Sequence, residues 1–227
     1  MSTSDSIVTQ YAELRREMVE QIARHAQLAG HETGKAVLSE KVMDVMLSVP
    51  RHEFVPVELR AFAYTDSPLP IGYDKTISQP FIVALMTDLL DLQAEDCILE
   101  VGTGLGYQAS ILAKLVERVY SMEILDELAD GASRRLTEQG AINVEVRVGD
   151  GSKGWPEHAP FDKILVAAAP DLIPTSLLSQ LKPGGKMVIP AGIENAQQLM
   201  LVEKNEKGQL SVEEILPVRF SSLTLSH

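Results

Sequence analysis

Apolar residues recur at helical spacing near the beginning of the chain. Within residues 11–28 they form one stripe, made of Leu14, Met18, Ile22 and Ala26. This spacing predicts an amphipathic helix, which the glycines of residues 30–34 are expected to break. A second, short helix is predicted to begin after Ser39, a preferred N-cap residue, and to end at Pro50.

The pattern changes along the rest of the chain. Residues 64–80 hold several prolines and a glycine and predict a loop, followed by a helix over about 79–92. From residue 95, apolar runs of strand length alternate with helical patterns. The strands are predicted at 97–101, 119–122, 144–148, 163–167 and 186–189, and the helices at 105–116, 126–139 and 173–181. Such alternation is typical of a parallel, doubly wound sheet.

The last part of the chain has a different pattern. Residues 197–203 and 212–220 are strand-like and flank the turn sequence Asn205-Glu206-Lys207-Gly208, which predicts an antiparallel hairpin. The sequence therefore predicts an α/β fold with a Rossmann-like doubly wound sheet, N-terminal helices and a C-terminal hairpin. We expect one domain over residues 1–227, made of a helical part (1–92), an α/β core (93–192) and the hairpin (193–227).

Charge and cysteine content narrow the class of protein. The chain of 227 residues has 20 basic and 32 acidic side chains, a net charge of -12. This excess argues against a nucleic-acid or membrane-surface partner, since both need a basic face. A single cysteine, Cys97, and the lack of a secretory signal pattern at the start of the chain favour a cytoplasmic protein. We expect it to be a monomer.

A glycine-rich segment follows the first strand of the α/β part. Glu100-Val101-Gly102-Thr103-Gly104-Leu105-Gly106 joins a predicted strand to a predicted helix, where glycines allow the main chain to approach a ligand closely. Its G-x-G-x-G spacing differs from the dinucleotide pattern G-x-G-x-x-G, which disfavours a dinucleotide oxidoreductase. A strand-to-helix turn without a ligand is the alternative interpretation.

Two more candidate positions follow the next two strands. Glu123 lies 21 residues after Gly102, and an acid near this spacing can accept hydrogen bonds from ribose hydroxyls. Gly149-Asp150-Gly151 ends the third strand, where the carboxylate could accept from an adenine amino group. The alternative interpretation of Glu123 alone is a solvated charge at a strand end, and that of Gly149-Asp150-Gly151 alone is a common turn. Together, each at the carboxyl end of a strand, they indicate an adenosine-bearing cofactor.

These motifs resemble class I S-adenosylmethionine-dependent methyltransferases. A second set resembles the protein-L-isoaspartate O-methyltransferase family more closely. It comprises Val49-Pro50-Arg51-His52-Glu53-Phe54-Val55-Pro56, Thr76-Ile77-Ser78-Gln79-Pro80, Ala159-Pro160-Phe161-Asp162 and Leu181-Lys182-Pro183-Gly184-Gly185. The resemblance covers about residues 38–224. It departs from the family pattern at Asp74-Lys75 and around residues 218–223.

The resemblance implies an activity and a site. The family transfers a methyl group from S-adenosyl-L-methionine to the α-carboxylate of L-isoaspartyl residues in damaged proteins and peptides. It implies a catalytic role for Ser78 and a place beside cofactor and substrate for Thr76 and Ile77. Cofactor contacts are implied or suggested for Glu100, Gly102, Thr103, Gly104, Gly106, Glu123, Asp150 and Gly151.

Two alternatives stay open from the residues. Ser78 could instead be the N-cap of the helix expected from about residue 79. The acceptor could be a carboxylate on a dedicated peptide or small molecule. No metal site is expected, because neither His52 nor His158 has a second ligand at metal-binding spacing.

Overall fold

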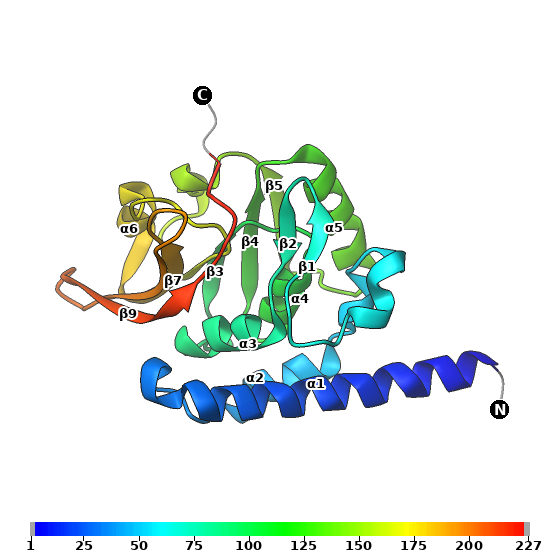
Figure 1. Cartoon of the computed structure of the whole chain (residues 1–227). Coiled ribbons are helices and arrows are strands. Elements are labelled where there is room, and N and C mark those ends of the chain that lie inside the picture. The colour runs from blue at the N-terminus through cyan, green and yellow to red at the C-terminus, as the bar shows by residue number, and fades with distance from the viewer. Residues whose placement is uncertain (1–2, 225–227) are drawn as a thin grey trace.

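A seven-stranded sheet forms the centre of the computed structural model, which describes residues 3–224 (Figure 1). Its strand order is β5-β4-β3-β6-β7-β8-β9. The strands are β3 (Cys97–Val101), β4 (Arg118–Glu123), β5 (Val144–Val148), β6 (Phe161–Val166), β7 (Leu181–Ala191), β8 (Gln197–Lys204) and β9 (Leu210–Val218). Strands from β5 to β7 pair in parallel, whereas β8 pairs antiparallel with β7 and β9. The predicted Rossmann-like sheet with a C-terminal hairpin is confirmed.

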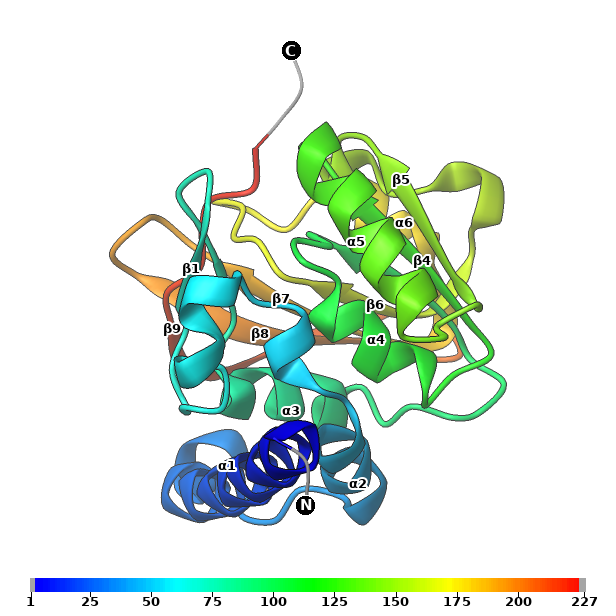
Figure 2. The same cartoon turned by 90° about the vertical axis from the view of Figure 1, so that its right-hand side faces the viewer.

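The two faces of the sheet bury different cores, because side chains alternate along a strand. On β3, Ile98 packs in the larger cluster, beside helices α4 (Tyr107–Ala113) and α5 (Asp126–Glu138), and Leu99 packs in the smaller one. The smaller cluster includes Leu177 from α6 (Thr175–Gln180). Figure 2 shows α4 and α5 together in front of the sheet. Burial on both faces explains the consecutive apolar residues in the inner strands β3 and β6, whereas β5, at the edge of the sheet, alternates with the exposed Glu145 and Arg147.

The N-terminal helices extend the larger core. Helices α1 (Thr3–Thr33), α2 (Glu40–Ser48) and α3 (Pro80–Leu89) contact one another, and α3 lies between α1 and the sheet (Figures 1 and 2). Two short 3-10 helices, Arg51–Glu53 and Val57–Phe62, join α2 to the next segment. The predicted stripe of α1 is confirmed, since Met18, Ile22 and Ala26 are at most 1% exposed.

The end of α1 was wrongly predicted. The helix continues through Gly30 and ends at Thr33, and Gly34 follows it with a φ of +65°. A Cβ atom on Gly30 would lie 2.6 Å from the Cβ of Ala36. Gly30 therefore does not break the helix. Its missing side chain lets the chain after the helix pack close to it.

The loop predicted over residues 64–80 contains a small antiparallel hairpin. Strands β1 (Leu69–Gly72) and β2 (Lys75–Ile77) pair in it, and the two residues between them, Tyr73 and Asp74, both have a φ of +54°. Positive φ at both central residues is the signature of a type I′ hairpin turn. The sequence does not signal this turn, because the glycine that usually allows it is absent.

Among the element boundaries that differ from expectation are those of α3 and β7. Helix α3 begins at Pro80 and not at Gln79, because proline suits the first helical position. The segment Leu181–Gly185, expected to lie outside the strand, forms the beginning of β7, with an irregularity in its pairing to β6. Neither shift moves the carboxyl ends of the parallel strands, where the candidate site lies.

Candidate functional site

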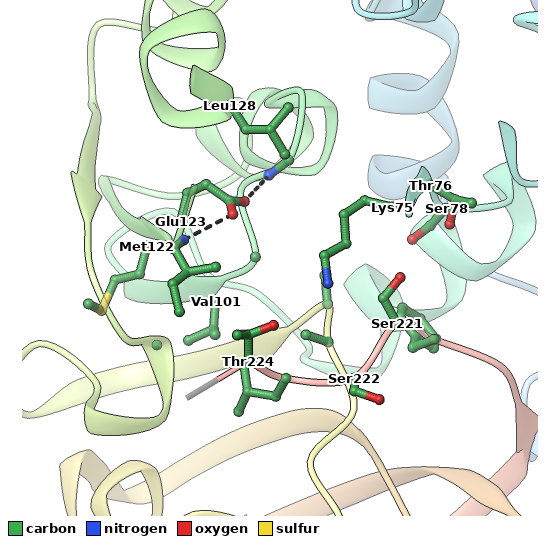
Figure 3. A pocket seen from close by; sticks show the side chains of 18 of the residues that line it. Lys75, Thr76, Ser78, Val101, Met122, Glu123, Leu128, Ser221, Ser222 and Thr224 are labelled. Carbon is green, nitrogen blue, oxygen red and sulfur yellow. Dashed lines mark hydrogen bonds between the residues drawn. The ribbon is translucent and has the colours of Figure 1, made fainter. Parts of the chain in front are cut away.

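A cavity of about 670 Å³, including the part open to solvent, lies at the carboxyl ends of β3, β4 and β6. This is the edge at which open α/β sheets bind ligands. Its walls come from β2 and the residues after it, the glycine-rich loop, the end of β4, the loops after β5 and β6, and residues 220–224 (Figure 3).

The glycine-rich loop forms one wall through Gly102 and Gly104. Both have positive φ, +94° and +54°. A Cβ on Gly104 would meet only Ile71 Cδ1, at 3.7 Å, and otherwise open space. Gly106, with a φ of +90°, is the N-cap of α4 and faces Ala132 and Leu136 of α5. The first two glycines are therefore placed for a ligand, and the third serves packing.

Glu123 ends β4 and lines the same cavity, with only 6% of its surface exposed. Its Oε2 accepts a hydrogen bond from the Gly104 N–H at 2.8 Å, and its Oε1 accepts from the N–H groups of Ile124 and Leu125 at 2.9 and 3.2 Å. A carboxylate has about four acceptor positions. Glu123 thus anchors the glycine-rich loop to the end of β4 while it faces the cavity.

Glu100 lies beneath this wall and is fully buried. The hydroxyl of Ser121, its register partner on β4, donates to Glu100 Oε2, and Thr103 Oγ1 lies 2.6 Å from the same hydroxyl. Glu100 Oε1 has no hydrogen-bond partner. Burial, with a smaller contribution from Glu123, raises the pKa of Glu100 to about 8. The structure therefore places Glu100 and Thr103 in a support beneath the cavity.

The residues of the Gly149-Asp150-Gly151 turn have two different positions: the glycines face the cavity, and the Asp150 side chain bonds within the turn. Gly149 and Gly151 line the cavity, and a Cβ on Gly151 would lie 2.2 Å from Val101 Cγ1. The Asp150 carboxylate accepts from the main-chain N–H and the hydroxyl of Ser152 at 3.0 and 2.7 Å. Asp150 thus shapes the turn whose glycines form the wall.

Thr76 and Ser78 line the opposite wall of the cavity, whereas Ile77 between them is buried in the larger core. The alternative role of Ser78 as a helix cap is wrong, because the N-cap of α3 is Gln79. The first turn of α3 is instead held by Asp66, whose Oδ1 accepts from the Phe81 N–H at 2.8 Å. The Ser78 hydroxyl is therefore not needed for capping.

Arg51 supports this wall from behind, and the sequence did not single it out. Its guanidinium is fully buried and donates to the carbonyl oxygens of Ala63 and Ser78 at 2.8 and 2.7 Å. It also lies over the Tyr107 ring, 4.9 Å from the centroid. Burial lowers the pKa of Arg51 to about 10. The available signal was its place in the segment of residues 49–56, which resembles the family.

The C-terminal segment completes the cavity. The Ala169 N–H donates to the Ser221 carbonyl and the Leu223 N–H donates to the Ala169 carbonyl, both at 2.9 Å. The Ser221 hydroxyl donates to the carbonyl of Asp74, at 3.3 Å, in the turn of the β1–β2 hairpin. These contacts bring residues 220–224, including Thr224, into the lining.

The two histidines considered from the sequence lie in aromatic contacts. The His52 ring stacks on Tyr11 at 3.8 Å and its Nδ1 lies 2.6 Å from the Tyr64 hydroxyl, while His158 stacks on Tyr120 at 3.9 Å. Over residues 3–224 there is no group of three side chains placed to hold a metal ion. Nor does that range contain a helix with the length and apolar character needed to span a membrane.

Comparison with known proteins adds independent findings. A family model described as protein-L-isoaspartate(D-aspartate) O-methyltransferase matches residues 23–227. Protein-L-isoaspartate O-methyltransferase 1 of Polaromonas sp. (strain JS666 / ATCC BAA-500) is 58% identical over 213 residues, which are 94% of this chain and 90% of that protein. Protein-L-isoaspartate O-methyltransferase 2 of Syntrophobacter fumaroxidans (strain DSM 10017 / MPOB) is 55% identical over 218 residues, covering 96% and 88%.

Solved structures show the same fold. A protein-L-isoaspartate O-methyltransferase structure matches with a TM-score of 0.78 and 26% identity, over 92% of this chain and 65% of that one. A Plasmodium falciparum structure, determined in complex with S-adenosyl-L-homocysteine, matches with the same TM-score and 22% identity, over 92% and 98%. This second likeness concerns the fold alone.

Proposed function

Since the chain belongs to the protein-L-isoaspartate(D-aspartate) O-methyltransferase family, we propose that it methylates the α-carboxylate of L-isoaspartyl residues in damaged proteins. The methyl donor is S-adenosyl-L-methionine. One observation carries the proposal: the glycine-rich loop with Glu123 and the hydroxyl-bearing segment of Thr76 and Ser78 face each other across one cavity. A methyl donor and an acceptor can therefore meet there.

The cavity fits the donor, which supplies an electrophilic methyl group on a positively charged sulfonium when bound. Gly102 and Gly104 would hold it with exposed main chain, and the cavity fills the space where a Cβ of Gly104 would stand. Glu123 would accept hydrogen bonds from the ribose, and Gly149 and Gly151 leave room for the adenine ring.

Four other residues, proposed from the sequence as cofactor contacts, would act indirectly by holding the residues that line the cavity. Glu100 and Thr103, joined through Ser121, keep the end of β3 and the glycine-rich loop in place. Gly106 gives α4 its start against α5, and Asp150 shapes the turn after β5. Their effect on binding is through the shape of the wall.

The acceptor needs positioning rather than activation. A peptide α-carboxylate has a pKa of about 3.3–3.7 and is ionised at neutral pH, so no general base is required. Opposite charges disappear as the methyl group moves, and a dry, closed site favours such a step. Ser78 would donate its hydroxyl hydrogen to one carboxylate oxygen and leave the other oxygen free to attack. Thr76 and the Ser221–Thr224 segment narrow the space around it.

The proposal extends to the oligomeric state, the cellular location and the partners of the protein. We propose that residues 1–227 work as one monomeric, cytoplasmic unit without a nucleic-acid partner. The shared core of α1, α3 and the sheet, the single cysteine and the net charge of -12 support this view.

A methylation assay with paired peptides tests the function. One peptide contains an L-isoaspartyl residue and its twin contains L-aspartate at the same position. With radiolabelled donor, we expect base-labile label on the isoaspartyl peptide only, because a methyl ester hydrolyses in base. Equal labelling of both peptides, or of neither, would contradict the proposal and favour a dedicated small-molecule or peptide acceptor.

Ser78→Ala tests the acceptor wall in the same assay. Loss of a preorganised donor lowers turnover by roughly ten- to a thousandfold, and affinity for S-adenosyl-L-homocysteine should change little. Ser179→Ala, an exposed serine of α6, is the matched control. Normal turnover of folded Ser78→Ala would remove the hydroxyl from the reaction.

A further inference from the structure

Only two of the residues that line the cavity carry a charge, Glu123 and Lys75. Three main-chain N–H groups already donate to the Glu123 carboxylate. The half-buried Lys75, by contrast, extends from β2 into the cavity (Figure 3). Within residues 3–224 its amine makes no hydrogen bond or ion pair. An ammonium without a partner that faces a cavity attracts an anion.

The hairpin holds Lys75 in place. Lys75 pairs with Gly72 directly after the type I′ turn of Tyr73 and Asp74. The Asp74 carbonyl accepts a hydrogen bond from Ser221, so the main chain on the N-terminal side of Lys75 is tied to the C-terminal segment. On its C-terminal side Lys75 continues into Thr76 and Ser78, which line the cavity.

We propose that Lys75 binds the α-carboxylate of the acceptor and so sets the preference of the site for an anionic group. The proposal rests on the proposed function. The acceptor is favoured because Lys75 belongs to the segment that carries Ser78, whereas Gly102, Gly104 and Glu123 form the other wall. The amino-acid end of the cofactor also presents a carboxylate, and the experiment separates the two sources.

The charge of the acceptor gives the expected kinetic effect. The carboxylate is negative before the reaction and neutral as an ester afterwards, so its attraction to Lys75 weakens as the transition state forms. An interaction that is stronger in the ground state than in the transition state lowers KM without raising kcat. Lys75 is therefore a specificity residue, and its loss should raise KM and leave kcat unchanged or higher.

The experiment compares Lys75→Met, which keeps the length without the charge, with Lys75→Arg, which keeps the charge. Lys207→Met, in the exposed β8–β9 turn, changes the net charge equally and is the control. The assay measures kcat and KM for the isoaspartyl peptide at low and high ionic strength. Titration calorimetry measures the Kd of S-adenosyl-L-homocysteine.

We expect Lys75→Met to raise KM roughly tenfold, as for a charged hydrogen bond that is partly screened, and to keep kcat. Lys75→Arg should restore KM, the Kd should not change, and added salt should raise KM in the wild type but not in Lys75→Met. Unchanged KM in folded Lys75→Met overturns the proposal. A raised Kd instead assigns the amine to the cofactor carboxylate. Failure of the proposed function is distinct, because the wild type itself would leave the isoaspartyl peptide unmethylated.

Discussion

Substitution of Glu100 by glutamine tests the electrostatics beneath the cavity. The folded protein keeps Glu100 buried with Oε1 unpartnered and raises its pKa from an ordinary value of 4.5 to about 8. In the unfolded chain the same carboxyl loses its proton near 4.5. Between these pH values the folded state therefore holds a proton that the unfolded state releases. The stability contributed by neutral Glu100 is complete below about 4.5 and is lost as the pH rises through about 8.

The size of the effect follows from the two pKa values. One pKa unit corresponds to about 1.36 kcal/mol. A rise of the Glu100 pKa from 4.5 to about 8 therefore corresponds to about 5 kcal/mol of stability, lost as the pH increases from the lower to the higher of these two values. Glutamine cannot ionise and has no such dependence. Its carbonyl can accept from Ser121, but its amide takes the place of the unpartnered Oε1 and costs about 1–3 kcal/mol at every pH.

The measurement is urea unfolding of the wild type and Glu100→Gln from pH 5 to pH 9. We expect the wild type to be the more stable protein at pH 5, and the difference to shrink or reverse by pH 9. The comparison uses this difference because groups other than Glu100 titrate in both proteins, and their contributions to the pH dependence cancel. Two stability curves that stay parallel from pH 5 to pH 9 would refute the reasoning.

Three further substitutions test the walls of the cavity. Glu123→Ala removes the acceptor of three N–H groups and should weaken S-adenosyl-L-homocysteine binding roughly ten- to hundredfold; unchanged affinity by calorimetry would remove Glu123 from the site. Gly104→Val places a β-branched residue at a φ of +54° and should abolish binding while the circular dichroism spectrum stays folded, and normal binding would mean that the loop is only a turn. Arg51→Met leaves the carbonyls of Ala63 and Ser78 without their donor and should cost about 1–3 kcal/mol of stability for each unsatisfied carbonyl, with a lower kcat; normal kcat in the folded fraction would show that Arg51 acts on stability alone.

The sheet was predictable because its signals are local. Each parallel strand contains apolar residues and has a turn signal on either side, and burial on both faces makes the apolar residues consecutive in the inner strands β3 and β6. The segment that carries Thr76 and Ser78 is different. Its hairpin rests on positive φ at Tyr73 and Asp74, and its hold on the C-terminal segment is a contact between Asp74 and Ser221, 147 residues apart. Propensity along a sequence contains neither fact.

The roles of the acidic residues could be predicted only in part. The glycine spacing indicated the loop, and the strand end indicated Glu123. Strand parity places Glu100 on the same face as Ile98, which lies in the core of the larger cluster. The same parity, with the pairing of Glu100 and Ser121, explains why Glu100, Ser121 and Glu123 come together. The pairing itself depends on the strand order, which the sequence does not contain.

Both walls of the cavity depend on a buried ionisable group outside the cavity lining. Glu100 lies under the glycine-rich loop, and Arg51 lies behind Ser78. Each carries an orphan polar atom, Glu100 Oε1 and Arg51 Nη1, and burial of such groups costs free energy that an apolar core would not. Methyl transfer depends on the distance and angle between donor and acceptor, so groups that fix the two walls from behind can act on turnover as well as on stability. The Arg51 substitution measures both effects at one wall, and the Glu100 substitution measures the effect on stability beneath the other.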